Sequence, residues 1–217
     1  MKIGELEIKE IYMDSSARMI CPPELIPSPG QYLLADLRGS ESPIAIPVFL
    51  SESTPDGFRS APALPSTWTP GAHLIARGPL GHGFSIPSSA RKIALIAFDD
   101  SPSRLRGLVP LSFKQKAEVV LVCDSSVNDL PEPVEVQPFQ ALTEILKWTD
   151  FIAADVAREN LDQFKEAMKK HLPETQVLIR APMPCGALAE CGVCALTVDY
   201  HWKMICKEGP VFNWTNL

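Results

Sequence analysis

Four cysteines near the C-terminal end constrain this chain more than any other feature of its sequence. They follow the spacing C-x5-C-x2-C-x11-C, at Cys185, Cys191, Cys194 and Cys206. The segment that joins the first three is rich in small residues, namely Gly186, Ala187, Ala189 and Gly192. Such a segment can wrap tightly around one point and turn its backbone N–H groups toward the sulfurs. We therefore predict that the four thiols converge on one metal centre.

The spacing favours an iron–sulfur cluster over three alternatives. Three cysteines on a short loop and a fourth further on resemble the plant-type pattern C-x4-C-x2-C…C, which binds 2Fe–2S. A zinc site would use the same thiolates, but zinc ribbons usually show two C-x2-C pairs, and here only Cys191 and Cys194 form one. Two disulfides require an oxidising compartment, and unligated buried cysteines do not cluster in this way. The sequence thus predicts a 2Fe–2S cluster on these four cysteines.

Three segments carry a resemblance to a known family. Residues 206–212 read CKEGPVF, residues 78–84 read GPLGHGF, and residues 29–32 read PGQY. They are similar to the C-K/E-D/E-G-P-V-F, G-P-L-G-N-G-F and P-G-Q-F/Y segments of the electron-transfer subunit of bacterial-type dihydroorotate dehydrogenases, which belongs to the ferredoxin-reductase-like flavoproteins. The likeness is specific at residues 78–84 and 185–212. The first cysteine gap departs from the family, since it is x5 here and x4 there.

The resemblance implies a function as well as a fold. It implies a subunit that passes electrons to or from a catalytic flavoprotein partner, in a hetero-oligomer that serves pyrimidine biosynthesis. The sequence shows no constellation of general acid, base or nucleophile, so we expect a non-catalytic subunit of an oxidoreductase complex. The alternative from a different class is a non-redox structural or regulatory subunit, in which the cysteines hold zinc or a vestigial cluster.

The hydrophobic pattern divides the chain into three parts, at residues 1–90, 91–182 and 183–217. The first part is proline-rich and predicts strands of a small antiparallel β-barrel, at residues 6–12, 31–37, 44–50 and 73–77. The second part predicts a parallel-sheet α/β domain, because apolar runs at residues 92–98, 117–123, 134–139, 151–154 and 176–180 alternate with helical patterns at 102–114, 141–148 and 159–172. The third part is the cysteine loop.

The flavin site that the resemblance implies departs from the family's pattern. The family uses an R-P-x-S-like segment, whose arginine meets the diphosphate, and a later G-x-G-T-like segment. Residues 42–49 contain no arginine, and residues 50–67 contain no G-x-G-T. We therefore expect the phosphate-binding strands to be shortened or missing and FAD binding to be lost. The remaining cations that can meet a diphosphate are Arg38, Arg59 and Arg77.

The nucleotide-binding turn departs in a similar way. Residues 97–102 read AFDDSP and lack the glycines that let a backbone approach a phosphate closely. Asp99 and Asp100 would repel a diphosphate at close range. We therefore expect no NAD binding, and we expect Asp99 to cap the helix that follows.

The glycine-rich segment at residues 78–84 has two interpretations, because glycine serves close backbone approach and tight turns alike. In the first, five residues contact a flavin, held by this chain or by a partner: Gly78, Leu80, Gly81, His82 and Gly83. In the second, the segment is a turn that links two domains. We also expect Trp202 to shield the cluster from water and Cys123 to be a small core residue.

Charge and hydropathy exclude two classes of partner. The net charge is −6 and no stripe of Lys and Arg is present, which argues against nucleic acid. No apolar run approaches the roughly 20 residues that span a bilayer, and the start, MKIGELEIKEI, lacks the apolar region of a secretory signal. We therefore expect a cytoplasmic protein without membrane contact, in which thiols stay reduced and favour a metal site.

Overall fold

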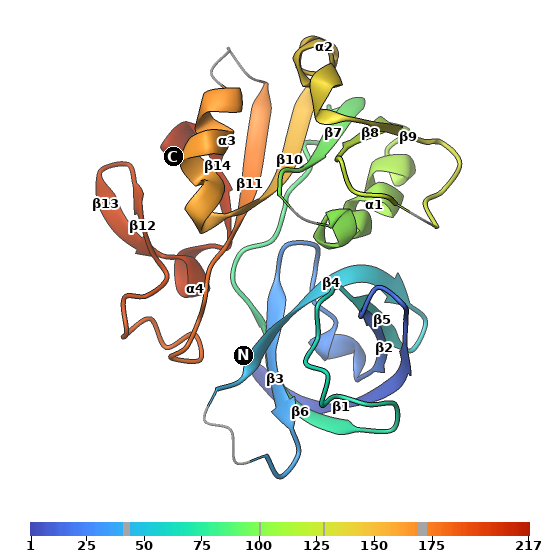
Figure 1. Cartoon of the computed structure of the whole chain (residues 1–217), viewed down its shortest axis with the longest axis vertical. Helices are drawn as coiled ribbons and strands as arrows, with labels where there is room; N and C mark the ends of the chain where they lie inside the picture. Colours follow the sequence, from blue (N-terminus) through green and yellow to red (C-terminus); the bar gives the residue numbers. More distant parts are fainter. Residues whose placement is uncertain (41–43, 100, 128, 169–172) are drawn as a thin grey trace.

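The computed structural model describes residues 1–40, 44–99, 101–127, 129–168 and 173–217. Within these residues the chain forms a closed six-stranded barrel, a six-stranded sheet flanked by short helices, and a two-stranded hairpin (Figure 1). The barrel comes first, the mixed sheet follows, and the cysteine-rich segment lies at the C-terminal end. This order confirms the predicted fold class.

The barrel is antiparallel, with the spatial order β1-β2-β5-β4-β3-β6. Its strands are β1 (Lys2–Ile11), β2 (Ala17–Ile20), β3 (Tyr32–Leu37), β4 (Ile46–Thr54), β5 (Gly57–Ser60) and β6 (His73–Leu80). Side chains that alternate along β1 fill the interior, where Leu6 and Ile8 pack with Phe58 of β5. Strands β4 and β5 are both present between residues 42 and 67, so the expectation that they are missing is wrong for the described residues, whereas shortening stays a prediction. A tight turn joins β4 to β5, and this hairpin closes the barrel against β2 and β3.

The second part is a parallel sheet with one antiparallel edge strand, in the order β14-β11-β10-β7-β8-β9. The parallel strands are β7 (Lys92–Ala97), β8 (Glu118–Val122), β9 (Val134–Gln137), β10 (Phe151–Ala157) and β11 (Glu174–Arg180). Strand β10 is buried along its whole length, as expected for a central strand covered on both faces. The chain runs from β7 outward to β9 and then crosses to β10 on the other side of β7. The sheet therefore has a topological switch point between β7 and β10.

The helices are shorter than the sequence predicts. They are α1 (Val109–Lys114), α2 (Leu142–Trp148) and α3 (Leu161–Ala167). The helix expected at residues 102–114 is divided into two 3₁₀ turns, Pro102–Arg104 and Arg106–Leu108, followed by α1. Pro110 lies in the first turn of α1, where its missing N–H costs no helical hydrogen bond, so the α-helix begins there. The last residues of the helix expected at 159–172, residues 169–172, lie outside the described residues.

The C-terminal segment returns to the sheet after the cysteines. It forms the hairpin of β12 (Ala195–Val198) and β13 (His201–Met204), then α4 (Ile205–Glu208) and β14 (Val211–Asn213). Strand β14 pairs antiparallel with β11, which fixes the chain just beyond Cys206 to the edge of the sheet. The sequence analysis assigned neither this edge strand nor the hairpin, because both are only three or four residues long.

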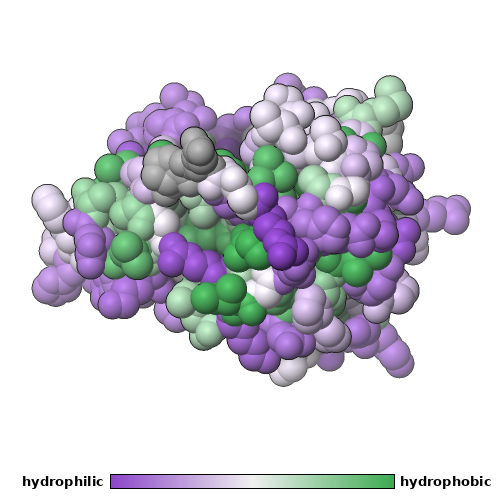
Figure 2. Space-filling model, turned by 90° about the horizontal axis from the view of Figure 1, so that it is seen from below, coloured by the Kyte–Doolittle hydropathy of each residue, from purple (hydrophilic) through white to green (hydrophobic). Residues whose placement is uncertain are grey.

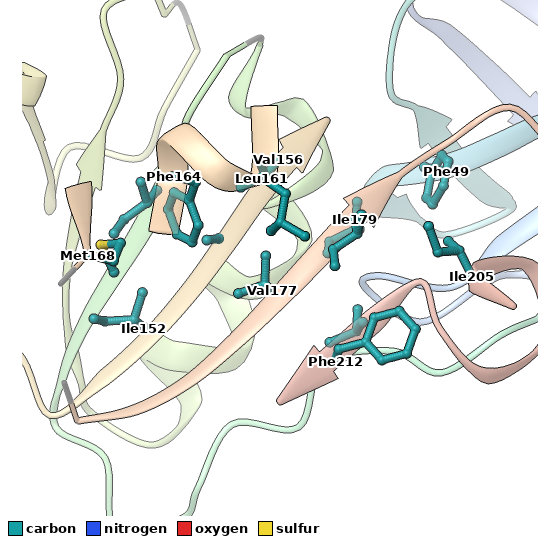
Figure 3. Close-up of a cluster of buried hydrophobic side chains, with 14 of the residues drawn as sticks. Phe49, Ile152, Val156, Leu161, Phe164, Met168, Val177, Ile179, Ile205 and Phe212 are labelled. Atoms are coloured by element: carbon teal, nitrogen blue, oxygen red, sulfur yellow. The ribbon is translucent and has the colours of Figure 1, made fainter. Parts of the chain in front are cut away.

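One hydrophobic core joins the three parts of the chain. It contains Phe49 of β4, side chains of the sheet such as Val177 and Ile179, and Ile205 of α4. Figure 3 shows Phe49 and Ile205 at the end of this cluster that faces the barrel, with Phe212 beside the sheet strands. The buried cysteines Cys194 and Cys206 belong to the same core. The cysteine segment is therefore packed against both domains.

In the part of the chain that the structure describes, no helix is both long and apolar enough to cross a bilayer.

Candidate metal centre

The four predicted cysteines lie together on the C-terminal segment, between β11 and the end of α4. Cys185 and Cys191 are in the loop before β12, Cys194 directly precedes β12, and Cys206 is the second residue of α4. Cys194 and Cys206 are buried, Cys185 is half-buried and Cys191 is exposed. The site thus has one end in the core and one end at the surface.

The cysteines are arranged as two neighbouring pairs. The thiol of Cys191 lies close enough to Cys185 to lower its pKa, and the thiol of Cys194 lies close enough to Cys206 to raise its pKa. Cys185 and Cys206 also act on each other electrostatically, so the two pairs adjoin. Among the described residues, no three His, Cys, Asp or Glu side chains converge closely enough in this structure to hold a single metal ion.

The pairs fit a dinuclear group, because each iron of a 2Fe–2S cluster takes two protein ligands. A cluster also carries negative charge and is stabilised by backbone N–H groups that point toward its sulfurs. The surroundings of Cys185 and Cys206 meet that second requirement.

Backbone N–H groups near Cys185 lower the pKa of its thiol. Burial raises the pKa of its thiol, but the N–H and thiol of Cys191 and the N–H groups of Glu190 and Leu188 outweigh burial and lower the pKa to about 6. The thiolate, which is the form that ligates iron, is thereby stabilised on the loop.

The pKa of the Cys206 thiol is shifted in the opposite direction to that of Cys185. Burial and the neighbouring thiols of Cys194 and Cys185 raise its pKa to about 12, against the opposing effect of the Ala189 N–H. A buried thiol among other thiols resists ionisation until a cation shares the site. The thiolate form is therefore favoured at Cys185, at the outer end of the site, and the neutral thiol is favoured at Cys206, at the inner end.

The loop achieves this through left-handed backbone conformations. Gly186, Ala187, Ala189 and Gly192 have φ between 60° and 71°. Gly186 and Ala187 are adjacent and Ala189 follows after one residue, and a left-handed residue beside a right-handed one turns neighbouring N–H groups to the same side, as in anion-binding concavities. Alanine adopts this conformation at a cost of order 1–3 kcal/mol, and such strain is concentrated at functional sites.

Three side chains from outside the segment hold it in place. The hydroxyl of Tyr32, on β3, donates a hydrogen bond of 2.6 Å to the carbonyl oxygen of Cys206. Arg77, on β6, donates to the carbonyl oxygen of Gly186, and Arg158, directly after β10, donates to those of Val193 and Ala195. Hydrogen bonds from both the barrel and the sheet therefore hold the cysteine segment.

The sequence pattern predicts none of these three residues as part of the site. Tyr32 stands in the P-G-Q-Y segment, and Arg77 is predicted only as a cation that can meet a diphosphate. Arg158 has no local sequence signal, since its role follows from the carboxyl end of β10 facing the cysteine loop.

The glycine-rich segment at residues 78–84 packs against the backbone that follows Cys206. The N–H of His82 donates to the carbonyl oxygen of Gly209 at 2.6 Å, and its Nδ1 lies 2.8 Å from the carbonyl oxygen of Glu208. A side chain at Gly81 would meet that same Gly209 oxygen at 2.5 Å, and one at Gly83 would meet the Pro29 carbonyl oxygen at 2.7 Å. These glycines therefore permit two backbones of this chain to approach closely.

The remaining members of that segment lie on β6. Gly78 has a φ of 153° and stands against Leu33, where a side chain would meet Cδ2 at 2.6 Å. Leu80 is partly buried against the shared core. The segment thus joins the barrel to the C-terminal segment.

The expectation that Trp202 shields the cluster is wrong. Trp202 is 78% exposed, because among the described strands β13 pairs with β12 alone, and although Val198 of this hairpin is buried, Trp202 is not covered. Leu188, Val193 and Tyr200 are exposed in the same region. Figure 2 shows hydrophobic residues at the surface on the side where this hairpin lies in Figure 1, with hydrophilic residues around them. Cys123 is buried, as predicted.

The switch point of the sheet is filled by the chain's own charges. Arg180 binds both Asp99 and Asp155, and Arg104 binds Asp155 at 3.2 Å. Asp99 also accepts hydrogen bonds from the N–H of Ala157 and the side chain of Asn160. Its expected role as a helix cap is wrong, since Ser101 caps the following 3₁₀ turn, and Asp100 lies outside the described residues.

Two cavities border this network. One of about 680 Å³ includes Asp14, Asp99 and Asp124 in its lining, and one of about 330 Å³ between barrel and sheet includes Phe49, Arg104 and Arg180. The three arginines considered for a diphosphate have other partners: Arg38 pairs with Glu5, Arg59 pairs with Asp14, and Arg77 binds Gly186. The cations near the expected cofactor positions are thus engaged within the chain.

Comparison with known proteins agrees with this geometry. Residues 181–217 match the family described as the iron-sulfur cluster binding domain of dihydroorotate dehydrogenase B. A structure of an NADH-dependent reduced ferredoxin-NADP oxidoreductase, described for flavin-based electron bifurcation, is 17% identical with a TM-score of 0.76, covering 97% of this chain and 88% of that chain.

Two other solved structures share the fold. The ferredoxin reductase in carbazole 1,9a-dioxygenase is 18% identical, with a TM-score of 0.63, over 79% of this chain and 67% of that chain. The flavohem-like FAD/NAD binding domain of nitric oxide dioxygenase from Vibrio cholerae O1 biovar El Tor is 14% identical, with a TM-score of 0.56, over 82% and 98% respectively. The resemblance stated from the sequence is confirmed: the fold is ferredoxin-reductase-like, and the C-terminal segment is similar to the iron–sulfur domain of dihydroorotate dehydrogenase B.

Proposed function

We propose that this chain is an electron-transfer subunit that holds a 2Fe–2S cluster on Cys185, Cys191, Cys194 and Cys206. The observation that carries the proposal is that all four thiols lie on one short segment, with Cys194 and Cys206 buried in the same core and Cys185 and Cys191 on the left-handed loop before them. The family match at residues 181–217 supports an iron–sulfur group at this place. Such a cluster, when bound, accepts and releases one electron at a time.

The residues around the site have separate tasks. Cys194 and Cys206, in the core, keep water from the inner side of the site, which the fully buried ring of Tyr32 also covers. Cys191 is exposed, so an electron leaves or enters most directly through this cysteine. Exposed apolar side chains beside it, Leu188 and Val193, offer surface for a redox partner.

We further propose that the partner is a catalytic flavoprotein of the dihydroorotate dehydrogenase type, in a hetero-oligomer. The support is the family match, since that domain is described for dihydroorotate dehydrogenase B. The described residues of the site provide thiols and backbone amides rather than an acid–base pair, which is consistent with substrate chemistry on another chain.

The subunit alone is proposed to bind neither FAD nor NAD. Arg104 and Arg180, the cations that line the cavity between the domains, are bound to Asp155, and a diphosphate would have to compete with that carboxylate. At the switch point, Asp99 already takes up the guanidinium of Arg180 and the N–H of Ala157, which a second diphosphate would need. A flavin contact by Gly78, Leu80, Gly81, His82 and Gly83 stays a prediction.

Two measurements test these proposals. Protein purified without oxygen is assayed for iron, acid-labile sulfide and zinc, and we expect iron and sulfide in equal amounts. Stoichiometric zinc without iron would replace the proposal with the structural-subunit alternative. The same protein is then denatured and any released flavin is separated by chromatography, where near-stoichiometric FAD would overturn the proposed loss of flavin.

A further inference from the structure

Two arginines bind the cysteine loop, and in the described residues neither of them forms an ion pair with a carboxylate. Of its nine arginines, six form ion pairs with carboxylates: Arg18, Arg38, Arg59, Arg104, Arg106 and Arg180. Within the described residues, Arg77, Arg91 and Arg158 are the ones for which no ion pair is found, and each donates to backbone carbonyl oxygens instead. Two of these three, Arg77 and Arg158, bind the cysteine loop.

The two arginines reach the loop at the residues that flank its cysteines. Arg77 binds the carbonyl oxygen of Gly186, which directly follows Cys185. Arg158 binds the carbonyl oxygens of Val193 and Ala195, which lie on either side of Cys194. Each of the two thiol pairs thus has a guanidinium at the neighbouring residue.

Arg77 lies directly against the backbone of the cysteine loop. A Cβ atom built on Gly186 would lie 2.5 Å from Nη2 of Arg77, so the guanidinium group stands beside the residue that follows Cys185. Where water is partly excluded, a charge at such a place acts on a neighbouring site more strongly than it would in water.

The other charges near the loop do not take over this role. Lys203 is bound to Glu208 in an ion pair of 2.8 Å, which cancels most of its field. Glu190, on the loop itself, and Lys207, which directly follows Cys206, are both exposed, so their charges are screened by water and salt. Arg77 and Arg158 are both partly buried, so their charges are screened less.

We propose that Arg77 and Arg158 are positioning residues that orient the cysteine loop and raise the reduction potential of the cluster through their positive charge. The inference rests on the proposed 2Fe–2S site. When dithionite supplies one electron to the oxidised cluster, the negative charge at the site increases by one, and nearby cations stabilise that reduced state. By binding carbonyl oxygens, the guanidinium groups also hold the loop with its N–H groups directed toward the sulfurs.

The test is a potentiometric titration of the purified chain, followed by visible absorption and paramagnetic resonance. Arg77→Gln and Arg158→Gln should each shift the midpoint potential to more negative values, and the double variant should shift it further. Arg77→Lys and Arg158→Lys keep the charge, so their midpoints should stay nearer that of the wild type. Arg91→Gln is the matched control, because Arg91 also binds carbonyl oxygens, and its midpoint should not change.

The outcomes separate the inference from the proposed function. If wild-type protein shows no 2Fe–2S spectrum, the proposed function fails. If the spectrum is normal but both Gln variants keep the wild-type midpoint, or the Lys variants shift as far as the Gln variants, the charge role is overturned. If a Gln variant loses the cluster, retention by the Lys variant supports the inference and loss by both contradicts it.

Discussion

The hydroxyl of Tyr32 donates a 2.6 Å hydrogen bond to the backbone carbonyl oxygen of Cys206, across a sequence separation of 174 residues. Tyr32 is fully buried, and burial followed by the neighbouring thiols raises its pKa, so the hydroxyl keeps its proton and acts as the donor. The bond ties the third strand of the barrel to the last ligand of the candidate cluster. The barrel is therefore part of the site, whether or not it binds a cofactor.

Replacing this tyrosine tests the connection. Tyr32→Phe removes the donor and leaves a buried carbonyl group short of a partner, which costs about 1–3 kcal/mol. We expect the free energy of unfolding to fall by that amount and iron to be released faster to a chelator. Tyr12→Phe is the control, because Tyr12 donates to Glu10 at the surface. Equal effects of the two variants on iron release would show that the bond does not support the site.

Two glycines of the cysteine loop offer a second test. Both have positive φ, but a methyl group at Gly186 would lie 2.5 Å from Nη2 of Arg77, whereas one at Gly192 would meet nothing within 4 Å. Gly186→Ala should therefore displace Arg77 and shift the midpoint potential in the same direction as Arg77→Gln. Gly192→Ala should carry the same backbone strain and leave the midpoint unchanged. Equal midpoints in the two variants would contradict the role of Arg77.

The cysteines and the fold class could be predicted because their signals are local. The spacing of the four cysteines from Cys185 to Cys206 is read directly from the chain. Strands β10 and β11 can be predicted because each contains a continuous apolar run. Short elements carry too little pattern for this, so the sequence did not reveal β14 or the hairpin of β12 and β13.

The supporting residues could not be predicted because they depend on tertiary contacts. Arg158 binds the cysteine loop only because the sheet brings the end of β10 beside it. Asp99 has the composition of a helix cap, but the switch point places Arg180, Asn160 and the N–H of Ala157 around it. The aromatic ring of Trp202 lies close to the cysteines in sequence, yet its hairpin carries it into solvent.

The buried ion network gives a stability prediction. Asp155 is 1% exposed and binds both Arg104 and Arg180. Asp155→Ala leaves the buried guanidinium of Arg104 and the partly buried one of Arg180 without this carboxylate, and breaking a buried pair typically costs about 3–5 kcal/mol. Urea denaturation measures the loss. Glu144→Gln, which removes one exposed ion pair with Lys147, should cost about 0–1 kcal/mol, and a similar cost for both variants would rule out a special role for the network.

Asp14 gives a prediction for the dependence of stability on pH. Burial raises its pKa, but hydrogen bonds from the hydroxyl and N–H of Ser16 and the charge of Arg59 outweigh burial, so the pKa is lowered in the folded protein. The stabilisation is therefore complete above the unfolded pKa of about 3.9 and is lost as the pH falls through the folded pKa.

Removal of the Asp14 carboxylate should make the free energy of unfolding depend less on pH at acidic pH. Asp14→Asn should be less stable than the wild type at about pH 7, and the difference should shrink as the pH falls below the unfolded pKa of about 3.9 and through the lower folded pKa, where the wild-type carboxylate becomes protonated. Urea unfolding midpoints across this range measure the effect. A stability difference that stays constant with pH would show that the loss comes from packing rather than from the charge of Asp14.

The central claim is that Cys185, Cys191, Cys194 and Cys206 hold one 2Fe–2S cluster. Paramagnetic resonance of the dithionite-reduced protein, with iron quantified on the same sample, tests it most directly. We expect the rhombic signal of a reduced 2Fe–2S centre in the wild type, its loss or alteration when any of the four is replaced by Ser, and no change in Cys21→Ser or Cys123→Ser. An iron-free protein, or a signal that survives unaltered in all four Ser variants, would contradict the account.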